Sequence, residues 1–583
     1  MAISTITGDS LLALDIGTIT TRAILFDVVD ERYRYLASGS AVTTAGAPFK
    51  DVGEGVRRAF DQLQKITGRD LLGGDENLII PSRPDGSGVD SFVVTMSAGK
   101  PLNILIAGLL EDVSVESAQH LAQTTYAKIV ETLSLNDRRQ QDNRIDTILR
   151  VRPDLIIMTG GLEGGASLSI RRLLEVISLG CSILPENLRP HILYAGNYSM
   201  QAEVKEVLTP IADFEVAPNI RPTLEAEQLS PAQSKLSELF RKIHSQHSPS
   251  VSELVHWSKG QFMPTSMAFG RIISFLSKVY RSNKGSLGID MGAAATTVAA
   301  AFDGKLELGV YPELGLGSGL AQLLRFTKLE NITRWLPVDV PPASVRDYVF
   351  NKAAYPASVP VTSEEMAIEQ ALARQIMQVA VQAISRRFPQ DGPVNSAGLL
   401  PQFEPIMATG GILSHAPTPG QALMMLLDGL QPTGVTTILL DQNNLVAALG
   451  AAAEANPLLA IQVLGSNTML NLGTVITPVG KARLGTPILR VRITYENGRE
   501  NSIEVKYGSL DVLPLNLGEA ATLKLQPLHR FDVGMGLGRG GRLQVLGGVP
   551  GVVIDARGRP ITLHADPERQ REIFKKWLWT LGG

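Results

Sequence analysis

Apolar and polar positions along the first third of the chain alternate in a way that predicts strands and helices. Residues 11–28 form a β-rich run, and a further strand is predicted over 33–44. Apolar residues at helical spacing predict a helix over 51–68, which ends at a glycine. A short apolar strand over 191–198 closes this region. Strands that first follow one another and then alternate with helices favour an α/β fold with a mixed sheet.

Between these segments the pattern predicts further strands and helices. Apolar runs predict strands over 90–99 and 103–112, and a helical pattern covers 115–133. The run "DLIIMTGGLEGG" at 154–165 is typical of a buried strand that enters a glycine turn, and a helix is predicted over 167–180. These elements belong to the same α/β half.

The pattern starts again after a linking segment. Residues 217–247 contain three prolines and an amphipathic helix. Paired strands are then predicted over 286–310, a long helix over 364–388, and a strand that enters a second glycine turn over 403–415. A helix, a strand and a final helix complete this second half at residue 453.

Short strands and turns replace this alternation from about residue 460. The segment "ENGRE" at 496–500 predicts a hairpin turn. A terminal helix follows at 566–581, with Asp566 as its N-cap just before Pro567. The pattern favours a β-barrel or sandwich that could recognise a partner, regulate a cleft between the two halves or buttress the second half.

The length of 583 residues fits three or four domains. We expect a first α/β lobe over 1–200, a helical linker region over 201–284, a second lobe over 285–458 and a β-rich C-terminal domain with a terminal helix over 459–583. With 44% hydrophobic and 19% charged residues the chain has ample material for globular cores.

The net charge and the cysteine count limit which binding partners and which cellular compartment are expected. A formal net charge of -3 gives no broad electrostatic reason to expect nucleic acid or anionic lipid as a partner. The lone cysteine, Cys181, cannot form an intramolecular disulfide, which fits a reducing cytoplasm. The N-terminal ten residues have neither a charged region nor a long apolar region of a signal peptide, and the most apolar late stretch is broken by Glu454 and Pro457. We expect no membrane span.

The two halves repeat one arrangement of residues, which indicates internal duplication. Each begins with Asp-x-Gly and hydroxyl residues in a hairpin, and each has a Gly-Gly pair after an apolar strand. The matching positions are Asp15, Gly17, Thr18, Thr20 and Thr21 against Asp290, Gly292, Thr296 and Thr297, with Gly160 and Gly161 against Gly410 and Gly411. Glycine lets a backbone approach phosphate closely, and an aspartate can hold a hydrated Mg²⁺. Two such hairpins facing one another would grip a polyphosphate.

This order of motifs resembles the actin, Hsp70 and sugar kinase superfamily, in which two RNase H-like lobes clamp ATP. Within it, the chain is similar to the glutamate mutase-associated MutL or GlmL family, which is unrelated to the mismatch repair protein of the same name. The resemblance spans roughly residues 10 to 455, with no landmark in the last 120 residues. The residues that carry it are "LDIGTITTRAILFD", "LIIMTGGLEGG", "YAGN" at 194–197, "APNIRPTLEAEQLSPAQSKLSELF", "GIDMGAAATT" and "ATGG".

The resemblance implies an ATP-dependent accessory protein for an adenosylcobalamin-dependent mutase, a chaperone or reactivating factor that couples nucleotide state to lobe closure. Asp15 and Asp290 would organise Mg²⁺ and water. Phosphates would be contacted at Gly17, Thr18, Thr20, Thr21, Gly292, Thr296 and Thr297, and adenosine would be bordered by Gly410 and Gly411. Hydrolysis in such a site depends on metal, phosphate positioning and an oriented water.

Three departures from the family pattern leave turnover open. Ala293 replaces a second glycine and Val298 replaces a closing aspartate in the second hairpin, while Glu163 stands in place of an aspartate in the first half. A weak ATPase and a protein that binds ATP without efficient hydrolysis are both compatible with these changes. The alternatives are a small-molecule kinase, for which no base is identified, and a noncatalytic or filament-forming actin-like protein. Homo-oligomerisation stays open.

A few other polar residues have simple structural interpretations. Glu365 and Glu369 lie one helical turn apart, and we expect a solvated helix face rather than a water-orienting role. His415 is interpreted as a surface loop histidine rather than a nucleotide contact. Arginines among glycines could form an anion-binding or partner-binding loop, although exposed positions on β-hairpins are the simpler interpretation; these are Arg539, Arg542, Arg557 and Arg559.

Overall fold

The computed structural model describes residues 9–280, 284–389 and 399–583. Residues 1–8, most of the segment in which we expect no signal peptide, lie outside this range. Internal contacts divide the described chain into two units, which are treated one at a time below. One unit comprises Asp9–Leu25 and Ala37–Ala268, and the other comprises Phe26–Leu36 and Phe269–Gly583.

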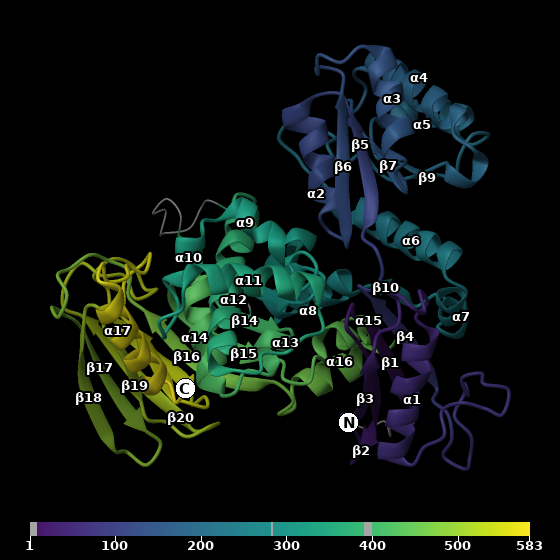
Figure 1. The fold of residues 1–583 in the computed structure, drawn as a ribbon. Coiled ribbons are helices and arrows are strands. Elements are labelled where there is room, and N and C mark those ends of the chain that lie inside the picture. The colour runs from purple at the N-terminus through teal and green to yellow at the C-terminus, as the bar shows by residue number, and fades with distance from the viewer. Residues whose placement is uncertain (1–8, 281–283, 390–398) are drawn as a thin grey trace, which may run out of the picture. The chain divides into compact units, whose positions relative to one another are not determined.

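The N-terminal sheet contains the first Asp-x-Gly hairpin. Its strand order is β10-β4-β1-β2-β3, from Phe262–Pro264, Ser91–Met96, Leu11–Ile16, Thr20–Val29 and Arg32–Val42 (Figure 1). Strand β4 runs parallel to both β1 and β10. Helix α1 (Gly53–Thr67) packs so closely on β3 that a Cβ on Gly39 would collide with Ala59 O. The chain between β4 and β10 forms a second sheet.

This second sheet is entirely parallel. Its order is β6-β5-β7-β8-β9, from Ala127–Ser134, Leu102–Gly108, Leu155–Met158, His191–Tyr194 and Phe214–Val216. Figure 1 shows α3 (Gln141–Val151), α4 (Ser167–Ile183) and α5 (Gln201–Leu208) gathered beside it. Because β5 lies between β6 and β7, the chain reverses its direction of progress across the sheet after β6.

The helix predicted over 115–133 is wrong in its second half. Helix α2 spans only Glu116–Ala122, and β6 begins at Ala127. Thr124 donates from Oγ1 to Leu121 O at 2.8 Å, which closes the last turn of the helix. The residues that follow pair in register with β5 from Leu102 onward, so the tertiary pairing overrides the local helical spacing. Helices α6 (Ser230–His247), α7 (Pro249–Trp257) and α8 (Thr265–Val279) follow the parallel sheet.

The other unit contains the second Asp-x-Gly hairpin in an eight-stranded sheet of order β13-β12-β11-β14-β15-β16-β22-β19. The strands in chain order are Gly285–Met291, Thr296–Phe302, Lys305–Tyr311, Phe403–Thr409, Gly434–Leu440, Leu470–Thr477, Leu510–Leu513 and Val552–Asp555. Taken from the β13 edge, its first five strands have the chain order third, second, first, fourth, fifth. The N-terminal sheet has the same order when it is taken from its β3 edge. This match confirms the prediction of two RNase H-like lobes in an α/β chain.

The C-terminal region is a β-sandwich, one of the two predicted alternatives. A four-stranded sheet, β18-β17-β20-β21, is built from Glu500–Lys506, Pro487–Tyr495, Ala520–Pro527 and Gly541–Leu546. Its apolar side chains share one core with Ile476 and Ile554 of the eight-stranded sheet. The predicted hairpin turn joins β17 to β18. The terminal helix α17 (Pro567–Thr580) is capped as predicted, because Asp566 Oδ1 accepts a hydrogen bond from Glu568 N at 3.0 Å.

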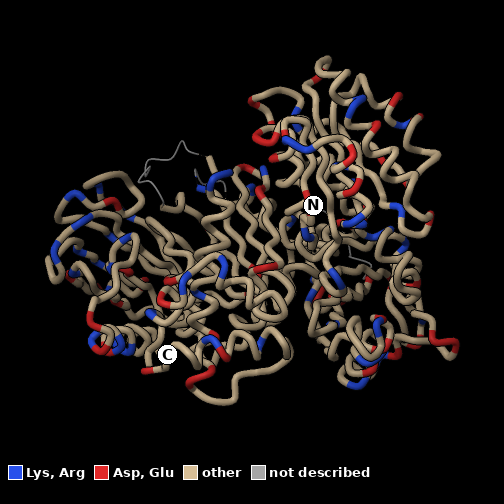
Figure 2. The backbone as a smooth tube through the Cα atoms, turned by 45° about the horizontal axis from the view of Figure 1, so that its top comes forward, with Lys and Arg blue, Asp and Glu red and all other residues tan. Residues whose placement is uncertain are grey.

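Charged side chains are distributed evenly along the backbone. Figure 2 shows Lys and Arg interspersed with Asp and Glu in both units. Of the helices within the described ranges, none combines the length and apolar character that crossing a membrane requires.

Candidate functional site

The first Asp-x-Gly segment forms a tight turn between β1 and β2. Gly17 N donates to Thr20 O at 3.0 Å, and a Cβ on Gly17 would lie 2.9 Å from that same oxygen. Thr43 supports the turn from just beyond β3, since its Oγ1 donates to Gly17 O at 2.7 Å. The turn therefore needs glycine at this position because the returning strand passes so close.

Asp15 lies near the end of β1 with its carboxylate held by two hydroxyls. Thr95 Oγ1 donates to Asp15 Oδ1 at 2.8 Å and Thr265 Oγ1 donates to the same oxygen at 3.3 Å. Arg22 Nη1 lies 4.0 Å from Asp15 Oδ2. Burial raises the pKa of Asp15, and the Arg22 charge and the two hydroxyls offset this rise only in part. Sequence reasoning missed Thr95, Thr265 and Arg22. Only Thr95 had a local signal, a polar residue near the end of an apolar strand.

The threonines of the first turn divide into two groups. Thr18 and Thr20 are partly exposed, and Thr18 Oγ1 donates weakly to Ser97 O at 3.3 Å. Thr21 is fully buried and its hydroxyl lies 2.8 Å from Thr43 Oγ1. Thr18 and Thr20 therefore face outward at the turn, whereas Thr21 joins it to the segment after β3.

The second turn has the same backbone arrangement. Gly292 N donates to Ala295 O at 3.0 Å, and a Cβ on Gly292 would lie 3.0 Å from that oxygen. Thr296 is fully buried and donates from Oγ1 to Leu314 O at 2.7 Å. Thr297 pairs in register with Asp290, which is partly exposed. In each unit the glycine N–H thus bonds the carbonyl three residues ahead.

The strand that runs parallel to each aspartate carries a matching threonine. Asp15 pairs in register with Thr95 of β4, and Asp290 pairs in register with Thr409 of β14. The agreement of two turns and two Asp–Thr pairs extends the duplication beyond the residues recognised in the sequence. It also identifies which glycines correspond.

The two Gly-Gly pairs do not occupy equivalent positions. Gly410 and Gly411 directly follow Thr409, so they stand beside the second turn. Gly160 and Gly161 instead follow β7 of the separate parallel sheet. By strand order, the counterpart of Gly410–Gly411 is the segment 97–99 after β4. The pairing expected from the sequence is wrong here because two different parallel sheets both end strands in glycine.

Gly410 is required by its close approach to β11. Its φ is +103°, and a Cβ there would collide with Met291 O. Thr409 Oγ1 lies 3.4 Å from both Asp441 Oδ2 and Asn444 Oδ1. Asp441 is fully buried and also accepts a hydrogen bond from Val446 N at 2.8 Å. Asp441 was missed in the sequence, where it ends the strand in "ILLDQNN".

The structure accounts for Val298 and shows how the turn at Ala293 is packed. Val298 is fully buried, pairs with Ile289 and belongs to the apolar core of this unit. An aspartate there would place a charge in that core. Ala293 O lies where a Cβ on Gly317 would approach to 2.7 Å, so the alanine turn is closely packed against the following loop.

Three separated family landmarks of the first half meet at the carboxyl edge of the parallel sheet. Asn219 Nδ2 donates to Glu163 Oε1 at 2.8 Å and to Gly161 O at 3.0 Å. Asn197 Nδ2 donates to Gly165 O at 2.6 Å. Glu163, which departs from the family aspartate, is thus tied to the glycine loop rather than to Asp15 or the first turn.

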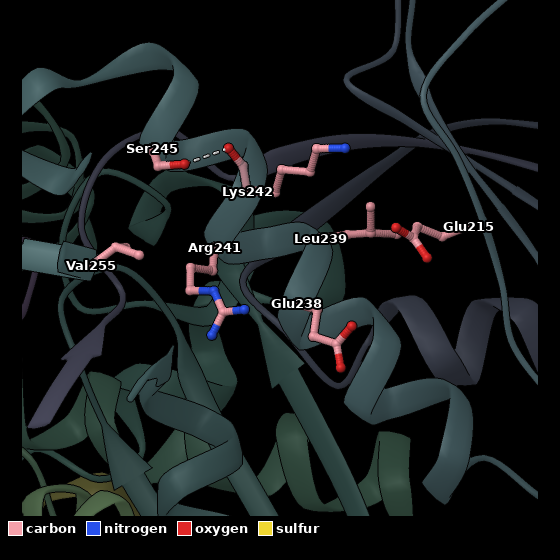
Figure 3. Close-up of a pocket in the computed structure, with 7 residues that line it drawn as sticks. All are labelled: Glu215, Glu238, Leu239, Arg241, Lys242, Ser245 and Val255. Atoms are coloured by element: carbon pink, nitrogen blue, oxygen red, sulfur yellow. Dashed lines mark hydrogen bonds between the residues drawn. The ribbon is translucent and has the colours of Figure 1, made fainter. Parts of the chain in front are cut away.

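A separate pocket lies between β9, α6 and α7. Figure 3 shows that its lining is mainly charged and comes from Glu215, Glu238, Leu239, Arg241, Lys242, Ser245 and Val255. None of these residues belongs to either turn. Within residues 9–280, 284–389 and 399–583 no group of three or more His, Cys, Asp or Glu side chains could hold a metal ion.

The expected helix face at Glu365 and Glu369 is wrong for Glu369. Glu365 accepts a hydrogen bond from Val361 N at 2.7 Å and completes a capping box with Thr362. Glu369 is buried and its Oε1 lies 2.7 Å from Lys352 Nζ. His415 is exposed, as expected, and its Nδ1 lies 3.0 Å from Gly411 O.

Two of the four C-terminal arginines are buried, contrary to the expected exposed hairpins. Arg557 Nη1 donates to Asp428 Oδ1 at 2.7 Å, and Arg557 Nε donates to Asp555 Oδ1 at 2.8 Å. Arg559 Nη2 donates to Asp555 Oδ2 at 2.8 Å, and Arg374 Nε donates to Asp428 Oδ2 at 2.7 Å. This network joins α12 (Ser363–Ser385) and α14 (Pro419–Leu430) to the end of β22.

The two other arginines, Arg539 and Arg542, are exposed as expected. Helix α17 covers the network, since the Arg557 guanidinium lies 4.8 Å from the Trp577 ring centroid and that of Arg374 lies 5.0 Å from the Phe574 ring centroid. The C-terminal sandwich is therefore joined to the second lobe by buried charge as well as by shared strands.

The chain is similar to a protein family and, at low identity, to several solved structures. The family model described as MutL protein matches residues 11–468. No curated protein matches the sequence. Among solved structures, nucleotide-free acetone carboxylase is 11% identical to this chain, with a TM-score of 0.30. The match covers 86% of this chain and 81% of the acetone carboxylase chain.

Two further solved structures are similar at the same level. The activator of 2-hydroxyisocaproyl-CoA dehydratase from Clostridium difficile, with bound ADPNP, is 10% identical with a TM-score of 0.28, covering 76% of this chain and 94% of its own. The diol dehydratase-reactivating factor in nucleotide-free form is 9% identical with a TM-score of 0.30, covering 77% of this chain and 99% of its own. TM-scores this low support no argument about function. The fold is therefore assigned from the strand order of this chain.

Proposed function

We propose, because the chain belongs to the MutL protein family, that it is an ATP-binding accessory protein that reactivates or chaperones an adenosylcobalamin-dependent mutase. Membership in this family is the resemblance predicted from the sequence. The observation that carries the nucleotide part of the proposal is the pair of matched turns, in which Gly17 and Gly292 make the same hydrogen bond and Asp15 and Asp290 have the same threonine neighbour.

The residues at each turn fit Mg²⁺ and phosphate. Asp15 and Asp290 supply the hard carboxylate oxygens that Mg²⁺ prefers, with water completing its shell. Bound there, Mg²⁺ would neutralise charge on the phosphates. The close-packed glycines at positions 17 and 292 keep side chains away from the ligand, and the partly exposed Thr18 and Thr20 could offer hydroxyls to phosphate oxygens. Thr297 is buried and stays a predicted phosphate contact.

Adenosine would be bordered by Gly410 and Gly411, which follow the strand paired with Asp290. Thr21 and Thr296 stay predicted phosphate contacts, although their hydroxyls bond Thr43 and Leu314 O. Because Val298 fills the core position of the family aspartate, we infer that ATP binding is coupled to slow or absent hydrolysis.

Calorimetric titration of the purified chain with ATP, with and without Mg²⁺, tests the nucleotide site. Asp15→Ala and Asp290→Ala should each weaken Mg²⁺-dependent binding by about tenfold or more, the effect of one lost charge-assisted contact of about 1.4 kcal/mol. Asp112→Ala, at an exposed position outside both turns, is the matched control. Wild-type protein that does not bind ATP would leave a scaffold role instead.

The partner is tested separately with a purified adenosylcobalamin-dependent mutase whose cofactor has been damaged. Addition of this protein with ATP, Mg²⁺ and intact cofactor should restore mutase turnover, and the Asp15→Ala variant should not. Restoration without ATP, or none with a mutase that the protein binds, would contradict the reactivating role.

A further inference from the structure

The outer face of α4 carries an ordered stripe of apolar and charged side chains. Leu168, Leu179 and Ile183 are 62%, 49% and 54% exposed. Arg172 and Glu175 lie between them on the same face, at the three- and four-residue spacing of a helix surface. The opposite face is buried against the parallel sheet and α3, so the stripe points away from the core of this unit. Figure 1 shows α4 beside α3 on the outer side of the parallel sheet.

The charges of the stripe have no ionic partner among the residues that the structure describes. Neither Arg172 nor Glu175 makes an ion pair with any residue in the described ranges. Their neighbour Arg171, by contrast, is already committed to α5, where its Nε lies 2.7 Å from Glu203 Oε1. Three exposed large apolar side chains and an unpaired cation and anion on one helix face provide both apolar and charged contacts for a partner.

We propose that this stripe binds a second copy of the same chain. The two α4 helices would lie antiparallel, and the twofold axis would cross the outer face of α4 level with the bond between Leu173 and Leu174. In that register Arg172 faces Glu175 of the second copy, and Leu168 faces Leu179 of the second copy. Each contact occurs twice, as an isologous interface requires. The stripe is therefore complementary to itself in both charge and apolar character.

The same register provides space for the last apolar residue of the stripe. Ile183 is set against Gly164 of the second copy. Gly164 is exposed, and nothing lies within 4 Å of a Cβ added there. The glycine loop that precedes α4 thus leaves room for the side chain that extends past the helix end. A partner of different sequence would need to supply this alternation of charge and size independently.

Sedimentation of the full-length, nucleotide-free protein over a range of concentrations tests the proposal. Wild-type protein should dimerise. Arg172→Glu and Glu175→Arg each set like charges face to face and should weaken the dimer by about tenfold, whereas the double variant Arg172→Glu/Glu175→Arg should regain most of the wild-type affinity. Leu179→Asp, which places two charges in the apolar contact, should weaken it by about a hundredfold.

The control is Ile66→Asp, at a residue that is 56% exposed at the end of α1 and outside the stripe. It should leave the dimer unchanged, and circular dichroism establishes that each variant is folded. Wild-type protein that stays monomeric at all concentrations overturns the proposal. So does a dimer that tolerates Leu179→Asp, or a double charge swap that fails to restore association. Because no ATP is present, these outcomes are independent of the proposed nucleotide function.

Discussion

Thr95 Oγ1 donates a hydrogen bond of 2.8 Å to the buried carboxylate of Asp15, at the point where the parallel strands β4 and β1 end together. The same register sets Thr409 beside Asp290 in the other unit. A carboxylate held by hydroxyls at a strand end is oriented without being neutralised, which suits a group that organises a hydrated cation. The burial of Asp15 affects the folding stability of the protein, whereas its proposed contact with Mg²⁺ affects ligand binding, so the two effects can be tested separately.

Replacing Asp15 with asparagine should stabilise the fold while weakening Mg²⁺-dependent ATP binding. Burial raises the pKa of Asp15 in the folded state, so the unfolded chain releases the proton first as the pH rises. The wild type therefore loses stability as the pH rises from about 4 through the raised pKa. The side-chain amide introduced by Asp15→Asn would keep an oxygen that accepts from Thr95 but would carry no charge.

Urea unfolding between pH 4 and 8 measures this effect. The stability difference between Asp15→Asn and wild type should grow with pH to about 1 kcal/mol. Asp112→Asn, on an exposed carboxylate, should show no such trend. A difference that stays constant with pH would show that the Asp15 carboxylate is not penalised by burial.

The neighbouring glycines after β14 should respond very differently to alanine. Gly410 has a φ of +103°, and its Cβ would collide with Met291 O, so Gly410→Ala should cost about 2–4 kcal/mol of folding stability. Gly411 has nothing within 4 Å of an added Cβ. Gly411→Ala should change stability by no more than about 0.5 kcal/mol. Equal effects of the two variants in denaturant unfolding would contradict the close approach to β11.

Local sequence patterns were sufficient for the turns and most strands, but not for which strands share a sheet. The Asp-x-Gly hairpins were predictable because glycine, hydroxyls and β-rich runs are adjacent in sequence. The assignment of Gly160 failed because β4, β7 and β14 are all short apolar strands followed by glycine. Only the pairing of β4 with β1 and of β7 with β5 separates them.

The burial of single polar residues could not be predicted from the sequence either. Arg557 lies among glycines that are typical of exposed hairpins, while its partner Asp428 is 129 positions away on α14. Thr265 reaches Asp15 across 250 positions. Such contacts follow from tertiary packing, so no local pattern could have indicated them.

Breaking the buried network should destabilise the second lobe together with the C-terminal sandwich. Arg557→Met removes the guanidinium that binds both Asp428 and Asp555 and leaves two buried carboxylates with fewer partners. The expected cost is about 3–5 kcal/mol. Arg539→Met, on an exposed arginine of the same glycine-rich segment, should be nearly neutral. A small, equal loss for both variants in denaturant unfolding would mean that the network contributes no more than a surface contact.

Cys181 should be a silent thiol in the folded protein. It lies on the buried face of α4, and burial raises the pKa of its thiol to about 12. Because the thiolate is the reactive form, a disulfide reagent at pH 8 should modify native protein at least about a hundredfold more slowly than denatured protein. Ser182→Cys places a second thiol one residue away on the exposed face and should add one fast-reacting group. Labelling of the native wild type at the rate of the denatured protein would contradict this prediction. It would show that α4 separates readily from the parallel sheet, so that the stripe on its outer face is not held in a fixed position.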